Sequence, residues 1–129
     1  MSPDNLAKLA VGLTALHSLI LGALLLAFPG VVLDLFGWQY DCSSFFPAQS
    51  GLFLILLGGA YLAGLWYRPF VWFLVTTKVA AVVFLVSEVM VGNCPTIVLL
   101  QGVLDGLMGT AVTLTAHQQR KSAVVYHRF

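Results

Sequence analysis

Three ionisable side chains, His17, Lys78 and Asp105, stand inside long apolar stretches of the sequence. A charged group is costly in hydrocarbon, so such side chains face the interior of a helix bundle and pair with one another. If these residues were catalytic, His17 and either Asp105 or Glu88 would act as acid and base on an apolar substrate. Lys78 would then hold a carboxylate or carbonyl oxygen of a lipophilic substrate. No diagnostic motif accompanies this set, so none of these residues is assigned as catalytic.

Further polar side chains belong to the same apolar stretches. Gln101 and Asp105 are four residues apart and share one helix face, whereas Gln49 and Glu88 are expected nearer the outer membrane surface. Together with His17 and Lys78 they predict an intramembrane polar cleft that opens outward. Three interpretations are open: a structural network that fixes helix register, a site for a small amphipathic ligand or a proton, and a set that mates with another subunit.

Two cysteines, Cys42 and Cys94, fall in predicted connections on the outer face. An oxidising compartment would permit a disulfide between them. The alternative is two unrelated small residues in loops. Two thiols without a nearby histidine make a poor ligand set, so we expect no metal site.

Several classes of function find no support. The sequence contains no H-E-x-x-H, C-x-x-C, nucleophile elbow or phosphate-cradling loop, which leaves zinc-protease, thiol-redox, hydrolase and nucleotide chemistry without a motif. The formal net charge of +1 is too small to neutralise a row of phosphates, so we expect no nucleic-acid partner.

The composition identifies the elements that must position these residues. Hydrophobic residues make up 60% of the 129-residue chain and charged residues 9%, whereas about a quarter of residues are charged in soluble domains. Lipid is therefore the expected solvent. Each apolar run is close to the roughly 20 residues that a helix needs to cross the hydrocarbon. The predicted fold is an all-α membrane four-helix bundle in one domain, residues 1–129, with spans at approximately 6–28, 48–66, 70–91 and 96–116.

A shorter amphipathic piece follows the first span. Val32, Leu35 and Phe36 recur at helical spacing within residues 31–40, which are too few to cross the membrane. This pattern predicts a short helix along the interface, with Trp38 and Tyr40 at headgroup level.

The positive charges near the ends of the spans predict the orientation. They occur only at the amino end, in the second connection and in the tail: Lys8, Arg68, Arg120, Lys121 and Arg128. By the positive-inside rule, both termini are expected on the cytoplasmic side, or on the matrix or stromal side in an organelle. From that side, His17, Lys78 and Asp105 come at similar depth, about 12 to 17 Å into the membrane. We therefore predict a Lys78–Asp105 pair with His17 nearby.

The layout also resembles a known family. The first helix ends in Phe28-Pro29-Gly30 with Leu35-Phe36-Gly37 after it, the second helix is glycine-rich from Gly51 to Gly58, and the fourth carries Asp105. In these features, over nearly the whole chain, the sequence resembles the DoxX-like small four-helix membrane proteins. This resemblance implies a compact bundle, in some cases associated with oxidoreductase systems that use quinones, and it implies no catalytic residue. A weaker similarity is to the four-helix sterol-isomerase-like proteins, whose motif does not match position by position.

Three functions follow from these observations. The leading interpretation is a non-enzymatic subunit or accessory protein that packs against other membrane subunits or copies of itself and holds a lipid or quinone in the polar cleft. The alternative is a membrane-embedded isomerase or oxidoreductase component that acts on a lipophilic substrate. A third interpretation is a small transporter, which would have to oligomerise to form a path.

Overall fold

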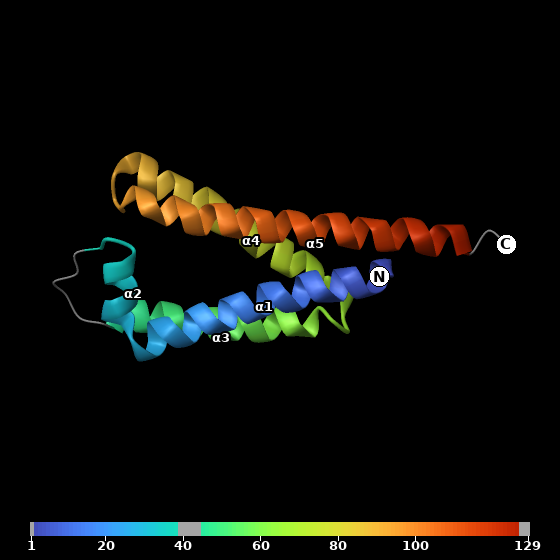
Figure 1. Ribbon diagram of the computed structural model, residues 1–129, viewed down its shortest axis with the longest axis horizontal. Helices are drawn as coiled ribbons and strands as arrows, with labels where there is room; N and C mark the ends of the chain where they lie inside the picture. Colours follow the sequence, from blue (N-terminus) through green and yellow to red (C-terminus); the bar gives the residue numbers. More distant parts are fainter. Residues whose placement is uncertain (1, 39–44, 127–129) are drawn as a thin grey trace.

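The computed structural model describes residues 2–38 and 45–126, with side chains up to residue 119. Every regular element in these ranges is helical, as Figure 1 shows, which confirms the predicted all-α fold. Four of the helical segments are long and apolar enough to cross a membrane. The elements in chain order are α1 (Pro3–Ala27), α2 (Pro29–Leu35), α3 (Phe45–Ala63), α4 (Arg68–Val91), the 3-10 helix η1 (Thr96–Val98) and α5 (Leu99–Tyr126).

Local sequence signals begin and end these helices. The Ser2 side chain accepts a hydrogen bond from the Asn5 N–H at the start of α1, where Pro3 occupies a first-turn position that needs no N–H donor. At the end of α4, Gly92 adopts the left-handed conformation with φ +81°. The Asn93 N–H then bonds the Glu88 carbonyl oxygen at 2.9 Å and closes the helix.

Two observed boundaries differ from the predicted ones for identifiable reasons. α3 ends at Ala63 rather than residue 66, because the N–H groups of residues 64 and 65 turn back to the Tyr61 and Leu62 carbonyls. α5 continues to Tyr126, ten residues beyond the predicted end at 116. Residues 117–126 contain neither glycine nor proline, so the backbone meets no helix breaker there. The predicted short helix after the first span is present as α2.

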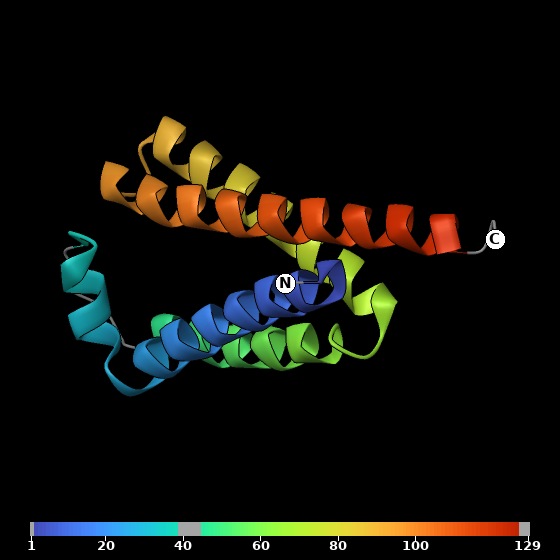
Figure 2. The ribbon, with the colours of Figure 1, turned by 45° about the vertical axis from the view of Figure 1, so that its right-hand side comes forward.

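The helices are arranged as two antiparallel pairs. Figure 1 shows α1 beside α3 and α5 beside α4, and the rotated view in Figure 2 shows the same pairs. The α1–α3 contact is close because glycine meets glycine: a Cβ added at Gly22 would lie 2.7 Å from the Gly51 carbonyl oxygen. Small residues at such a contact allow two membrane helices to approach closely.

The two pairs converge at one end of the molecule and separate at the other. A cluster of buried residues, Val11, Ala15, Tyr61, Leu74 and Val112, joins α1, α3, α4 and α5. Toward the opposite end the pairs diverge, and α2 lies across the opening (Figures 1 and 2). Polar residues that face inward near the middle of the spans therefore meet between the pairs.

Most large apolar side chains point away from this interior. On α1, for example, Leu13 and Leu16 are more than half exposed, and Val83 and Phe84 on α4 are similarly open. Lipid chains are the surroundings that such a surface requires. The chain is thus an integral membrane protein in which α1 begins and α5 ends at the same end of the bundle (Figure 1). The cytoplasmic assignment of that end stays a prediction from charge.

Candidate functional site

A buried ion pair links α4 to α5 near the middle of the bundle. The Lys78 ammonium nitrogen lies 2.5 Å from Asp105 Oδ1, and each residue is only 5% exposed. Both charges are removed from lipid as well as from water, so each is stabilised chiefly by the other. The contact between Lys78 and Asp105 that matched depth predicted is present.

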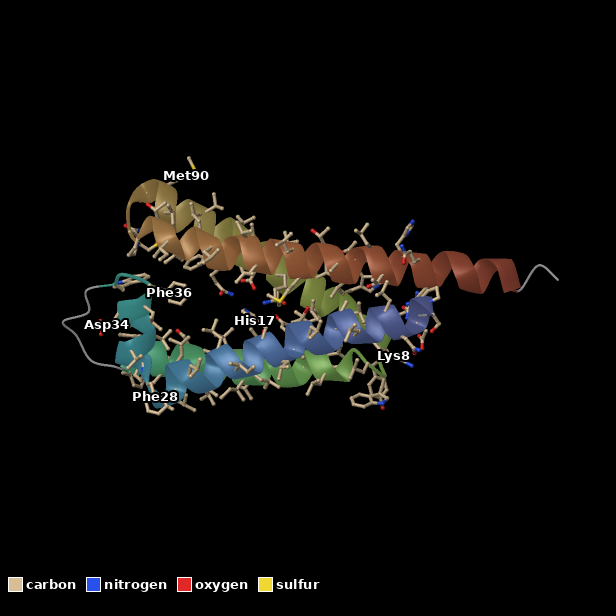
Figure 3. All side chains as sticks on the ribbon, in the orientation of Figure 1. Lys8, His17, Phe28, Asp34, Phe36 and Met90 are labelled. Carbon is tan, nitrogen blue, oxygen red and sulfur yellow. The ribbon has the colours of Figure 1, made fainter. Side chains whose placement is uncertain are left out.

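Gln101 connects this ion pair to α1. Its amide nitrogen lies 3.0 Å from His17 Nε2 and 3.4 Å from Asp105 Oδ1. Because an amide NH₂ group only donates, His17 Nε2 accepts in this contact, which leaves the proton of a neutral ring on Nδ1. Figure 3 shows His17 pointing from α1 toward the space between the helix pairs. His17, Gln101, Asp105 and Lys78 together form what we call the midplane network.

Tyr61 on α3 also reaches the midplane network. The sequence did not predict a role for this tyrosine. The Lys78 ammonium lies 5.9 Å from the centroid of the Tyr61 ring, within the range of a cation–π interaction. The Tyr61 hydroxyl lies 2.6 Å from Thr77 Oγ1, and this oxygen donates to the Leu74 carbonyl at 2.9 Å. The tyrosine therefore donates to Thr77. One signal was available, because Tyr61 is the only tyrosine inside the four predicted spans.

Two residues expected in the cleft lie outside the midplane network. Gln49 is exposed on α3. Glu88 accepts a hydrogen bond from the Asn93 side chain at 2.9 Å, beside the end of α4. It is ten residues beyond Lys78, or about 15 Å along the helix axis. Glu88 therefore lies toward the outer end of α4, as its depth predicts, and no hydrogen bond to a described residue joins it to the ion pair. The polar cleft that opens outward stays a prediction.

The geometry also bears on the acid–base pairs considered for catalysis. Gln101 stands between His17 and Asp105, so the described structure contains no direct hydrogen bond between these two side chains. Glu88 is bonded to Asn93. A proton leaving His17 for a carboxylate would have to pass an amide, which neither accepts nor releases protons readily.

Other hydroxyl groups on α1 have local roles. Thr14 donates to the Ala10 carbonyl of its own helix at 2.9 Å. The Ser18 hydroxyl is buried and has no hydrogen-bond partner among the described residues. Neither side chain extends the midplane network, although both flank His17 in the sequence.

The cysteines supply no cross-link in the described structure. Cys94 is a free, half-buried thiol, and Cys42 lies outside the described residues. The disulfide that the sequence left open is therefore not found in the part of the chain that the structure describes. Within the same part, no group of three or more His, Cys, Asp or Glu side chains could hold a metal ion.

A groove of about 320 Å³ runs between α4 and α5 on the flank of the bundle. Lys78 and Asp105 line it, and the apolar side chains of Val79 and Val83 form part of its wall. The two helices approach closely at Gly109, where an added Cβ would lie 3.3 Å from the Lys78 Cβ. We call this feature the lateral groove. It joins an apolar, lipid-facing surface to a buried charge pair, an arrangement able to bind an apolar molecule through one polar group.

A second, smaller cavity of about 170 Å³ lies beneath α2. Leu21 of α1, Val32 and Phe36 from the α2 region, and Gln101 of α5 line it. In Figure 3, Phe36 lies near the opening between the two helix pairs. The short helix α2 thus helps to cover the side of the midplane network nearest the diverging end.

No protein-family model matches the chain, and no characterised protein or solved structure is significantly similar to it. The DoxX-like resemblance therefore stays a prediction from the sequence, and the function has to be argued from the site itself.

Proposed function

We propose that the protein is a non-enzymatic subunit or accessory protein of a membrane assembly that holds a lipid or quinone in the lateral groove. The observation that supports this most directly is the position of Lys78, a buried hydrogen-bond donor on an otherwise largely apolar groove. The ligand class follows from the donors and the walls of the groove.

Lys78 has more donors than the described residues satisfy. An ammonium group carries three N–H donors, and one of them bonds Asp105. The ammonium forms no second hydrogen bond to any described residue, and the Tyr61 ring faces it at 5.9 Å. A donor left unsatisfied in a low-dielectric interior is costly. A ligand oxygen with a lone pair directed at Lys78 would remove that cost.

The walls of the lateral groove favour a ligand that is mostly hydrocarbon. Val79, Val83 and Leu114 line the groove on its α4 and α5 sides, and each is well exposed on the flank of the bundle. A quinone ring with its carbonyl oxygens, or the ester carbonyl of a lipid, combines apolar area with the required acceptor. A strongly charged solute would lose its hydration without sufficient compensation.

The accessory role rests on the same geometry. The amide of Gln101 separates His17 from Asp105, so no direct proton relay joins these two groups, which favours a binding role over catalysis by a relay between them. α4 also presents Phe73, Val79 and Phe84 on its exposed surface, an apolar face of the kind that a neighbouring membrane subunit or lipid covers.

Native mass spectrometry of the protein, extracted from its own membrane in mild detergent, tests this proposal. The intact protein should retain a lipophilic mass, together with partner subunits. The double variant Lys78→Met/Asp105→Leu keeps similar side-chain volumes and removes both charges, so it should fold and lose that mass. Glu88→Gln is the matched control, because Glu88 lies outside the lateral groove, and it should retain the ligand.

The outcomes separate the interpretations. A double variant that folds and retains the same lipophilic mass would contradict binding at the lateral groove. An intact protein that carries neither ligand nor partner would contradict the proposal as a whole. If the double variant keeps its partner subunits and loses the ligand, the result would support both the ligand site in the lateral groove and the accessory role.

A further inference from the structure

A cavity of about 430 Å³ lies at the end of the bundle where α1 and α4 begin. Its lining includes Lys8 of α1 and Arg68 of α4, together with residues of α5. Figure 3 shows Lys8 at this end of the molecule, far from Phe28 and Asp34 at the other. We call it the amino-end cavity. Its volume falls within the range of about 300 to 1,000 Å³ that is usual for small-molecule sites.

The charges around the amino-end cavity leave one cation uncompensated. Asp4 pairs with Lys8 at 2.7 Å through Oδ2 and accepts a hydrogen bond from Gln119 at 2.9 Å through Oδ1. The Arg68 guanidinium forms no ion pair or hydrogen bond with any described residue. Two cations stand against one carboxylate among these three side chains, which leaves a formal charge of +1.

The backbone adds to this positive potential. α1 and α4 both begin at the cavity, and helix amino ends carry partial positive charge. α3 ends nearby, but turn N–H groups already bond its last carbonyls; the Tyr67 N–H, for instance, donates to the Ala63 carbonyl at 2.8 Å. The local field therefore favours an anion.

One side of the amino-end cavity is apolar. Val11, Val71 and Val112, which are all buried, form this wall. Trp66 stands at the cavity and is 74% exposed, as is common for tryptophan at the headgroup level of a membrane. A free phosphate ion would use the cations and leave the apolar wall in contact with water. An amphipathic anion would use both.

We propose that the amino-end cavity binds an anionic phospholipid of the leaflet in which α1 begins. Arg68, whose planar guanidinium suits bidentate contact with phosphate oxygens, is the main contact, and Lys8 is the second. The part of an acyl chain nearest the headgroup packs along Val11 and Val71. This site is separate from the lateral groove and does not depend on the ligand proposed there.

Lipid titration of the purified protein, followed by native mass spectrometry, tests the site. Dioleoyl phosphatidylglycerol should bind more tightly than dioleoyl phosphatidylcholine, which has no net charge. Arg68→Gln should weaken phosphatidylglycerol binding about fivefold, the effect expected for one cation near a membrane anion. Inorganic phosphate alone should neither bind detectably nor displace the lipid, which distinguishes the phospholipid from a free anion.

A matched pair of variants separates local from overall charge. Asp4→Asn removes the carboxylate that pairs with Lys8 and keeps an oxygen that can accept from Gln119, so it should strengthen phosphatidylglycerol binding. Asp34→Asn changes the net charge equally, on exposed α2 at the opposite end, and should leave binding unchanged.

Three results would overturn the proposal. They are equal binding of the two lipids, an Arg68→Gln variant that folds and binds phosphatidylglycerol like the parent protein, and displacement of the lipid by millimolar phosphate. Equal effects of Asp4→Asn and Asp34→Asn would also contradict it, because net charge alone would then explain the binding. Arg68 is exposed, so its substitution should not impair folding.

Discussion

Removing one of the two buried charges, Lys78 or Asp105, should destabilise the bundle far more than removing both. Each residue is 5% exposed, so a single substitution leaves an uncompensated charge in the interior. Breaking a buried pair in this way costs about 3 to 5 kcal/mol, whereas replacing both partners with apolar residues is often neutral or stabilising by about 1 to 4 kcal/mol. An ordinary hydrogen bond between membrane helices contributes only about 0.6 kcal/mol. The difference in free energy of unfolding between the single variants and the double variant is therefore large enough to measure.

The surroundings predict which single variant is worse. After Lys78→Met, Asp105 keeps only the long 3.4 Å contact with the Gln101 amide. After Asp105→Leu, Lys78 still faces the Tyr61 ring at 5.9 Å, and a desolvated cation–π contact is worth up to about 2 kcal/mol. Lys78→Met should therefore lower the free energy of unfolding by the full amount, about 3 to 5 kcal/mol. The decrease for Asp105→Leu should be smaller by about 1 to 2 kcal/mol.

The assay is reversible unfolding in mixed micelles of dodecyl maltoside and dodecyl sulfate, followed by circular dichroism. The parent, the two single variants and Lys78→Met/Asp105→Leu form a double-mutant cycle, from which the coupling free energy is obtained. A coupling of at least about 3 kcal/mol is expected. If the double variant loses as much free energy of unfolding as the two single variants together, the ion pair is not the main stabilising partner of either charge, and the reasoning fails.

Two further predictions concern packing and topology. Gly22→Ala should lower the free energy of unfolding by about 1 to 3 kcal/mol, because its Cβ would meet the Gly51 carbonyl oxygen at 2.7 Å. The control Gly12→Ala meets nothing within 4 Å and should stabilise α1 by up to about 1 kcal/mol in the same assay, so equal effects would argue against the close α1–α3 contact. In a Cys42→Ser background, a membrane-impermeant maleimide should label Cys94 only from the side opposite an amino-terminal tag, because α5 begins at the end of the bundle opposite the start of α1. Labelling from the tagged side would contradict four spans.

The four long helices and the short one after the first span were predictable from residue types alone. Long runs with few charges leave the backbone no option in lipid except helices that satisfy their own hydrogen bonds. Proline and glycine then set most of the ends, as Pro3 and Gly92 do. The contact between Lys78 and Asp105 was also predictable, because two opposite charges at one depth in hydrocarbon have few alternatives to each other.

The surroundings of that pair follow from helix packing, which the sequence does not reveal. Whether Gln49 faces the interior, and whether Tyr61 reaches Lys78, depends on the rotation of α3 about its axis, and a helix that is apolar on nearly every face carries little periodic signal for that rotation. The close approach of Gly22 to Gly51 fixes it. The same packing brings Arg68 and Lys8 to one cavity, although 60 positions separate them in the sequence. Depth can be counted along a chain, but the direction in which a side chain points is set by the neighbouring helix.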